Sequence, residues 1–125
     1  MSAFMLEKKE LLLKGVMYTK GFVLHPPSRG QAQVSYRPNK RFRTFEATVG
    51  IRDGANGGAG SQSPLTFLVK ADDVQLWSSR PLQKCGLTET CSVPVASVEK
   101  LTLVVSCPGD NYCAHGAWGD PRLKE

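Results

Sequence analysis

The feature that most constrains the fold is a series of short apolar runs, each ended by glycine, proline or a polar cluster. Within Phe42–Ile51 the apolar residues from Phe45 onward occupy every second position, which is the period of a strand with one face in the core. Another run, Met17–Leu24, stops at His25-Pro26-Pro27 because proline removes a ladder donor. No long segment has a helical period. The pattern predicts an all-β antiparallel sandwich.

The same reasoning predicts the strands and turns of a single domain. Strands are expected at Glu10–Leu13, Met17–Leu24, Gln31–Tyr36, Phe42–Ile51, Leu65–Val69, Val74–Ser78, Cys91–Val95 and Lys100–Ser106. Two of them should form a hairpin around Ala71-Asp72-Asp73. The turn Arg37–Lys40 and the glycine-rich Arg52–Ser63, the longest loop, should separate others. We expect residues 1–10 to be an N-terminal extension and residues 11–125 to be the domain.

Composition excludes several classes of protein. The chain has 125 residues, 41% of them hydrophobic, which is enough for one folded core. The net charge of +5 is mild, and one basic cluster is present, Arg37, Lys40, Arg41 and Arg43. That cluster indicates a solvated turn or, alternatively, a contact for a polyanion. Nucleic acid is not an expected partner. Membrane insertion is not expected either, because no apolar run approaches ~20 residues.

Four cysteines repeat one local spacing, Cys85 with Cys91 and Cys107 with Cys113. An even number in turn-rich segments favours two disulfides, each closing a loop, although four cysteines allow three connectivities and the sequence does not choose among them. Free thiols are the main alternative, and a four-thiolate zinc site is a weaker one because zinc knuckles usually have closer spacing. The charged N-terminus does not resemble a secretory signal. The location therefore stays open: extracellular if the disulfides form, intracellular otherwise.

The segment Cys107–Leu123 concentrates the groups that a sugar-binding loop needs: Asp110, Asn111, Tyr112, His115, Trp118 and Asp120. An indole ring stacks on the apolar face of a pyranose, while carboxylates, amides and imidazoles bind its hydroxyl groups. The same residues would also suit a structural plug with Trp118 buried. Asp110, Asn111 and Asp120 offer oxygen ligands for a structural calcium ion, although their spacing matches no EF-hand loop.

Residues outside this segment could complete a site. His25 ends a strand, where its ring either bonds backbone atoms or reaches a ligand beside His115. Arg52 and Asp53 open the glycine-rich loop, either as ligand contacts or as a surface ion pair of little energetic value. No catalytic motif is present: the nucleophile elbow, the phosphate-binding loop and the zinc-protease helix are all missing. We therefore expect a protein that is not an enzyme.

Five motifs in order resemble the NPCBM family of carbohydrate-binding modules. They are Tyr18-Thr-Lys-Gly-Phe-Val-Leu-His-Pro-Pro-Ser28, Phe45-Glu-Ala-Thr-Val-Gly-Ile-Arg-Asp53, the hairpin from Phe67 to Ser79, Leu101-Thr-Leu-Val-Val105 and His115-Gly-Ala-Trp-Gly-Asp-Pro-Arg-Leu123. The resemblance spans Leu11 to Leu123. It implies a jelly-roll-like sandwich related to galactose-binding domains, with ligand-binding loops at one end that a calcium ion sometimes braces. No other cofactor is implied.

The function that follows is non-catalytic binding of galactose-type glycans by an accessory domain of a larger protein. Its expected partners are a glycan or glycoprotein and neighbouring domains. The expected ligand-binding residues are His25, Arg52, Asp53, Asn111, His115, Trp118 and Asp120. The alternative is a protein-interaction or scaffolding domain of an intracellular protein. It is motivated by Ala117, where the family has an acidic residue, and by the short segment before Tyr18.

Overall fold

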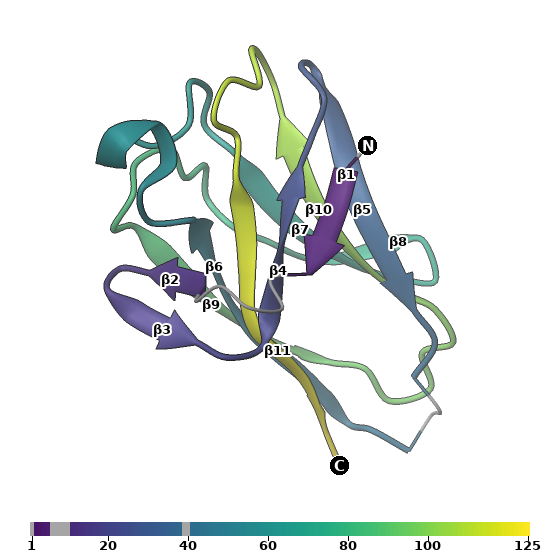
Figure 1. Ribbon diagram of the computed structural model, residues 1–125. Helices are drawn as coiled ribbons and strands as arrows, with labels where there is room; N and C mark the ends of the chain where they lie inside the picture. Colours follow the sequence, from purple (N-terminus) through teal and green to yellow (C-terminus); the bar gives the residue numbers. More distant parts are fainter. Residues whose placement is uncertain (1, 6–10, 39–40) are drawn as a thin grey trace.

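Two antiparallel β-sheets packed face to face form the body of the protein. The computed structural model describes residues 2–5, 11–38 and 41–125. In Figure 1 the two sheets cross the molecule from one set of loops to another, and a small hairpin lies against one of them. This architecture confirms the predicted all-β antiparallel sandwich. Among the described residues, no helical segment has the length and apolar character needed to cross a bilayer.

The first sheet has the strand order β1-β4-β11-β6-β9 within the described chain. These strands are β1 (Ser2–Met5), β4 (Gly21–His25), β11 (Gly116–Lys124), β6 (Thr44–Ile51) and β9 (Thr88–Pro94). The central strand β11 pairs with β4 through Gly116–Gly119 and with β6 along most of its length. The chain entering from the N-terminus and the chain leaving at the C-terminus therefore share one sheet.

The second sheet has the strand order β5-β10-β7-β8, and a separate two-stranded sheet is formed by β2 and β3. The bounds are β5 (Gly30–Tyr36), β10 (Leu101–Cys107), β7 (Thr66–Ala71), β8 (Val74–Ser78), β2 (Leu11–Leu13) and β3 (Val16–Tyr18). A 3-10 turn, η1 (Ala55–Gly58), lies in the glycine-rich loop. The predicted hairpin is confirmed: β7 and β8 pair around Asp72 and Asp73, both at positive φ.

Alternation of side chains explains the core. On β6, Phe45, Ala47 and Val49 are buried, while the residues between them are only half-buried. On β10 nearly every residue is buried, because that strand is central in its sheet. The inward faces of the two sheets meet in one cluster that includes Phe67 and Trp118. A smaller cluster of Leu11, Leu13, Val23 and Ala117 attaches the β2–β3 hairpin.

Three segments differ from the sequence-based expectation. Ser2–Met5 forms β1, paired with β4, so these four residues are part of the sheet; the rest of the predicted extension 1–10 lies outside the described residues. The single strand expected over Met17–Leu24 is two strands, because the chain leaves β3 and joins another sheet as β4. Most of the segment from His115 onward, expected to be loop, is the central strand β11. Tertiary pairing overrides the local sequence pattern in each case.

Antiparallel pairing brings four connections to one end of the sandwich, which we call the loop end. They follow β4, β6, β8 and β10, at residues 26–29, 52–65, 79–87 and 108–115. Figure 1 shows η1 and the β10–β11 connection together there, at the end away from the C-terminus. Backbone hydrogen bonds join these connections, including Gln62 N–H to the Tyr112 carbonyl (2.9 Å) and Ser61 N–H to the Gln83 carbonyl (2.8 Å).

Replacing Gly60 with alanine is expected to destabilise the loop end by about 2 kcal/mol more than the matched change Gly57→Ala. Both glycines have positive φ, +101° and +64°, so both substitutions strain the backbone. At Gly60 a Cβ would also collide with the Gln83 carbonyl and approach the Lys84 Cα at 2.8 Å. Gly57 has open space. Urea unfolding of the two variants measures the difference; equal losses would contradict the packing argument.

Candidate carbohydrate-binding site

A hollow of about 280 Å³ lies at the loop end, where β6 runs into the glycine-rich loop. The lining residues come from the β6–β7 connection and from the end of the β10–β11 connection. They are Arg52, Asp53, Gly54, Ala55, Asn56 and His115. Three of the predicted ligand-binding residues, Arg52, Asp53 and His115, therefore meet around one space. We call this space the loop-end hollow.

The backbone of Arg52 is fixed on both sides, which positions its side chain at the hollow. Its N–H donates to the His115 carbonyl (3.0 Å). Its own carbonyl accepts bonds from Ala55 N–H (3.2 Å) and the Cys85 thiol (3.3 Å). Within the described residues, the half-buried guanidinium has no carboxylate partner, so its donors are free for a ligand.

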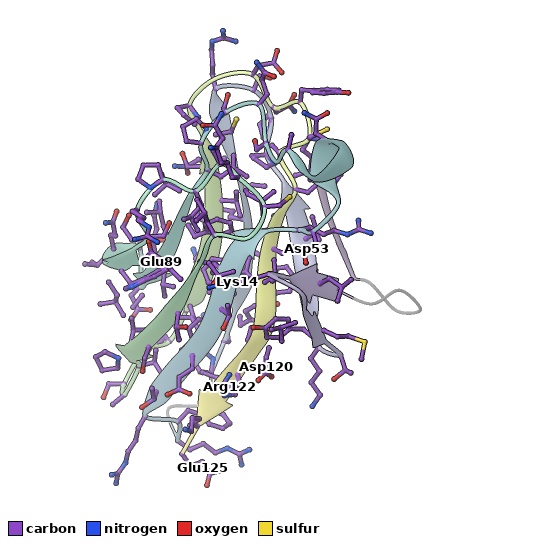
Figure 2. The ribbon with its side chains drawn as sticks, turned by 90° about the vertical axis from the view of Figure 1, so that its left-hand side faces the viewer. Lys14, Asp53, Glu89, Asp120, Arg122 and Glu125 are labelled. Carbon is purple, nitrogen blue, oxygen red and sulfur yellow. The ribbon has the colours of Figure 1, made fainter. Side chains whose placement is uncertain are left out.

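Asp53 supports the site and does not face a ligand with free oxygens. One carboxylate oxygen accepts the Lys14 N–H (3.0 Å) and the other accepts the Gly15 N–H (2.8 Å). Figure 2 shows Asp53 close to Lys14 at the β2–β3 hairpin. The Asp53 N–H also donates to the Leu12 carbonyl (2.8 Å). The residue attaches the hairpin to the end of β6.

His115 is half-buried and lies against a second imidazole. The ring centroids of His115 and His25 are 5.3 Å apart and their planes are inclined at 54°. The His25 Nε2 lies 2.9 Å from the Asn111 carbonyl oxygen, so this nitrogen carries the proton and donates. Burial lowers the pKa of His115 below its usual 6.5, and the charges of His25 and Arg52 lower it further. At neutral pH His115 is therefore uncharged, with one donor and one acceptor nitrogen.

Acidification is expected to reduce stability through His115. Because the folded-state pKa is lowered, the unfolded chain binds this proton more readily, and stability rises with pH across the interval between the two values. The contribution is complete above 6.5 and is lost as pH falls through the folded pKa. Urea unfolding between about pH 7.5 and about pH 5 should show a smaller loss in His115→Gln than in the parent. An identical pH profile in the two proteins would contradict the assignment.

Asn111 is a brace between two connections. Its side-chain amide donates to the Pro26 carbonyl (2.9 Å), and its side-chain oxygen accepts from the Ser28 hydroxyl (3.0 Å). The Asn111 N–H donates to the same Ser28 oxygen (2.9 Å). With these bonds made, Asn111 holds His25 and the loop after β4 in place and has little capacity left for a ligand.

Trp118 and Asp120 do not lie at the loop-end hollow. Trp118 is 0% exposed and packs against Phe67, with ring centroids 5.8 Å apart, so the prediction that it provides an exposed stacking surface is wrong. Asp120 lies further along β11, where it accepts a bond from Arg122 (2.9 Å); Figure 2 shows this pair well away from Asp53. The segment is a strand, so successive residues move steadily away from the loop end.

Two residues that were not among the predicted ligand-binding residues lie at the loop end, and one of them lines the hollow. Asn56 lines the hollow in a left-handed conformation (φ 51°, ψ 47°), exposed, with no partner for its side-chain amide among the described residues. Tyr112 is 60% exposed in the β10–β11 connection. Asparagine tolerates the left-handed backbone conformation of Asn56 better than most residues do. A signal was present in the sequence, an asparagine within glycines and a tyrosine within the loop.

All four cysteines are free thiols, so the disulfide prediction is wrong. The members of each spaced pair occupy different surroundings. Cys91 is buried on β9, and burial raises its pKa to about 12, while Cys85 donates to a loop carbonyl. Cys107 is buried at the end of β10 and donates to the Gly109 carbonyl (3.4 Å). Within the described residues no group of three or more His, Cys, Asp or Glu could hold a metal ion. The structural calcium ion stays a prediction.

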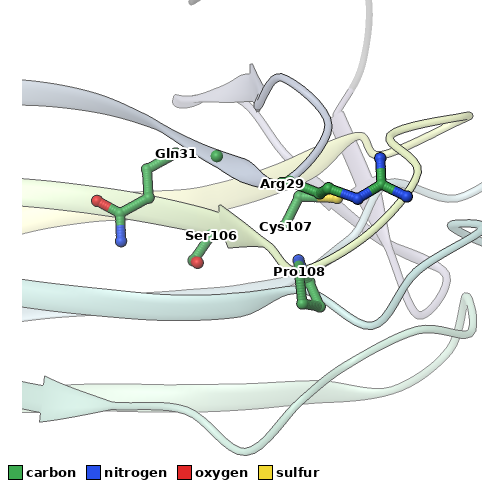
Figure 3. Close-up of a pocket in the computed structure, with 6 residues that line it drawn as sticks. Arg29, Gln31, Ser106, Cys107 and Pro108 are labelled. Atoms are coloured by element: carbon green, nitrogen blue, oxygen red, sulfur yellow. The ribbon is translucent and has the colours of Figure 1, made fainter.

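A second depression of about 280 Å³ lies at the loop end of β5 and β10. Figure 3 shows Arg29, Gln31, Ser106, Cys107 and Pro108 around it. Arg29 adopts a left-handed conformation (φ 54°) and its N–H donates to the Gly109 carbonyl (2.9 Å).

Comparison with known proteins adds the family. The sequence matches the NPCBM/NEW2 domain over residues 2–124. No curated protein matches it. Several solved structures share its fold, and the chain spans 28% of the first of them, the CBM51-2 and INT domains of Clostridium perfringens ZmpB in complex with GlcNAc. That structure covers 99% of this chain at 19% identity with a TM-score of 0.79, which shows the fold.

Two further structures are similar. The CBM51 of Clostridium perfringens GH95, solved in complex with methyl-galactose, is 26% identical with a TM-score of 0.73; the alignment covers 92% of this chain and 79% of that one. The tandem CBM51 modules of the Streptococcus pneumoniae family 98 glycoside hydrolase are 19% identical with a TM-score of 0.74; 91% of this chain and 35% of that one are covered. The galactose-binding-like sandwich expected from the sequence is confirmed.

Proposed function

Since this chain belongs to the NPCBM/NEW2 domain family, we propose that it is a non-catalytic carbohydrate-binding module that binds galactose-type glycans at its loop-end hollow. One observation carries the proposal: Arg52, Asn56 and His115 surround the hollow with side-chain donors and acceptors that the fold leaves uncommitted. The similar module of Clostridium perfringens GH95 was solved with methyl-galactose, which makes a galactoside the first ligand to test.

The chemistry of the hollow suits a sugar hydroxyl better than a charged group. A neutral imidazole can accept one hydroxyl proton and donate to another oxygen, while the Arg52 guanidinium donates to adjacent oxygens in one plane. Asn56 adds an amide that both donates and accepts. Tyr112 replaces Trp118 as the exposed aromatic ring of the loop end, where it can contact the apolar face of a pyranose.

The affinity for one sugar should be weak. The hollow is shallow, and a monosaccharide buries little surface against it, so a dissociation constant of roughly 1 mM is expected. A glycan chain that also contacts Tyr112 should bind more tightly. Neighbouring domains of a longer polypeptide, which the similar structures contain, would raise the effective affinity further by presenting several modules together.

A glycan array followed by titration with methyl β-galactoside and N-acetylglucosamine tests the proposal. We expect binding that His115→Ala and Asn56→Ala each weaken by about tenfold, the effect of one lost hydrogen bond at a buried contact. Asp120→Asn is the matched control, since Asp120 lies away from the hollow. A folded protein that binds no glycan on the array would overturn the proposal and favour the protein-interaction alternative.

A further inference from the structure

A second cleft, of about 180 Å³, opens between the two sheets at the end opposite the loop end. One wall is Tyr36 and Leu101, paired across β5 and β10. The other includes Phe45 and Leu123, paired across β6 and β11. Pro121 and Arg122 complete the lining. Figure 1 shows β11 continuing past β4 towards the C-terminus at this end. We call this space the inter-sheet cleft.

The cleft is open because β4 is shorter than β11. Strand β4 pairs with Gly116–Gly119 only, and a register shift separates Gly119 from Arg122. Beyond that shift, in the part of the chain that the structure describes, β11 has β6 as its one sheet neighbour. Apolar side chains that another strand would otherwise cover therefore line an accessible space.

Tyr36 gives the cleft an aromatic wall. The residue is 42% exposed, although its pair partner Leu101 is fully buried. Partial burial raises the pKa of its phenol, so the hydroxyl stays protonated and can donate. A partly exposed ring above an aliphatic floor is suited to the C–H face of a pyranose, with the hydroxyl available for a sugar oxygen.

Arg122 lies beside the cleft, and its side chain is on the outer face of the first sheet, because Arg122 pairs with Glu46 while Leu123 pairs with the buried Phe45. Its guanidinium donates to an Asp120 carboxylate oxygen (2.9 Å) and to a Glu46 carboxylate oxygen (2.7 Å), which hold the group in a fixed plane. Lys124 lies 3.5 Å from the same Glu46 oxygen. Two cations thus compensate two anions, and the network is polar without a net charge.

The remaining charges near the cleft leave a positive excess. Arg37 follows Tyr36, and the Arg43 N–H donates to the Lys124 carbonyl (2.8 Å), next to Leu123 of the cleft. Both arginines are exposed, and within the described residues neither has a carboxylate partner. Nearby acidic groups are engaged: Glu125 with Arg41 (3.7 Å), Asp73 with Lys100 (3.3 Å) and Asp72 with the Lys100 N–H (2.9 Å).

We propose that the inter-sheet cleft is a second carbohydrate-binding site, selective for glycans that carry uronate or sulfate groups. A sugar ring stacks on Tyr36 over the aliphatic floor, and its anionic groups pair with Arg37 and Arg43. An acidic peptide could satisfy the two arginines but would leave the aromatic wall unused. The proposal is independent of the galactoside site.

The test is titration of the full chain with a heparin-derived hexasaccharide and a chondroitin sulfate hexasaccharide at about 150 mM salt, where weak non-specific attraction is screened. Tyr36→Ala leaves the net charge unchanged and should weaken binding at least about fivefold. Arg43→Ser should weaken it similarly. Lys84→Ser removes one exposed positive charge at the loop end and is the matched control, with binding expected within about twofold of the parent.

Three results would overturn the proposal. They are no binding of either hexasaccharide, equal weakening by Arg43→Ser and Lys84→Ser, or equal competition by a polyglutamate peptide of the same charge. Tyr36→Phe keeps the ring and covers the case in which Tyr36→Ala fails to fold; it should retain most of the affinity. Methyl β-galactoside titration of the same variants keeps the two sites apart, because neither Tyr36 nor Arg43 lines the loop-end hollow.

Discussion

Replacing Trp118 with alanine is expected to lower the free energy of unfolding by about 3–5 kcal/mol, the range for removing a large aromatic side chain from a core. Trp118 is fully buried on the central strand β11. It contacts Phe45 and Phe67, with ring centroids 6.4 Å and 5.8 Å away, so it joins the inward faces of both sheets. Urea unfolding followed by far-ultraviolet circular dichroism measures the loss.

The variant Trp118→Phe distinguishes the effect of aromatic packing on stability from the effect of the unpaired indole N–H. The indole Nε1 is buried and has no hydrogen-bond partner among the described residues. Phenylalanine removes that unpaired donor and keeps an aromatic ring between the two phenylalanines, so we expect a loss of only about 1–2 kcal/mol. If Trp118→Ala instead has the same free energy of unfolding as the parent but loses galactoside binding, the indole would be a ligand contact. Its placement in the core would then be contradicted.

Removing the Arg52 side chain is expected to weaken galactoside binding by about 30–100-fold, because hydrogen bonds from a charged donor contribute about 1.5–3 kcal/mol. The same change should raise the pKa of His115, since burial, the His25 charge and the Arg52 charge together hold that pKa down. The variant Arg52→Ala therefore gives two readings, one by calorimetric titration and one by following the imidazole resonances through a pH series.

Arg52→Lys distinguishes the two roles. Lysine keeps the positive charge, so the pKa of His115 should stay low. It cannot reproduce the planar pair of donors, so galactoside affinity should still fall by about tenfold. Unchanged affinity in Arg52→Ala would remove Arg52 from the site, whatever the pKa of His115 does.

Much of the fold could be predicted because burial alternates along the strands. Phe45, Ala47 and Val49 alternate with half-buried neighbours, and two paired aspartates at positive φ explain the β7–β8 turn. The β1 strand and the break after Tyr18 could not be predicted, since short strands gain their stability from partners far along the chain. Those partners leave no local pattern.

The role of Trp118 is the clearest example of missing tertiary information. In sequence it stands among glycines and polar residues, as in a binding loop. In the structure, positions 116 and 119 have no room for a side chain. A Cβ at Gly116 would lie 2.8 Å from Val105, and a Cβ at Gly119 would lie 3.0 Å from the Tyr18 ring. The glycines allow the sheets and the hairpin to approach β11 closely. Close packing around the strand produces this composition.

The candidate site was partly predictable for a similar reason. Arg52 directly follows β6, and His115 directly precedes β11. Because β6 and β11 are paired at that end, the topology brings Arg52 and His115 together. Asp53 and Asn111 have the chemistry of ligand contacts, but backbone amides and carbonyls take up their hydrogen-bonding groups. Sequence cannot show which polar groups the fold itself consumes. It indicates Asn56 only as an asparagine among glycines, because the placement of this residue at the hollow depends on a left-handed turn.

The most direct test of the loop-end site is an amide-resolved NMR titration of the protein with methyl β-galactoside. We predict saturable shift changes at Arg52, Asn56, Tyr112 and His115, with no change around Tyr18, Lys20 and Asp120, which surround a different hollow on β11. Shift changes concentrated on that second group, or no saturable change from galactoside or N-acetylglucosamine, would contradict the assignment of the sugar site to the loop end.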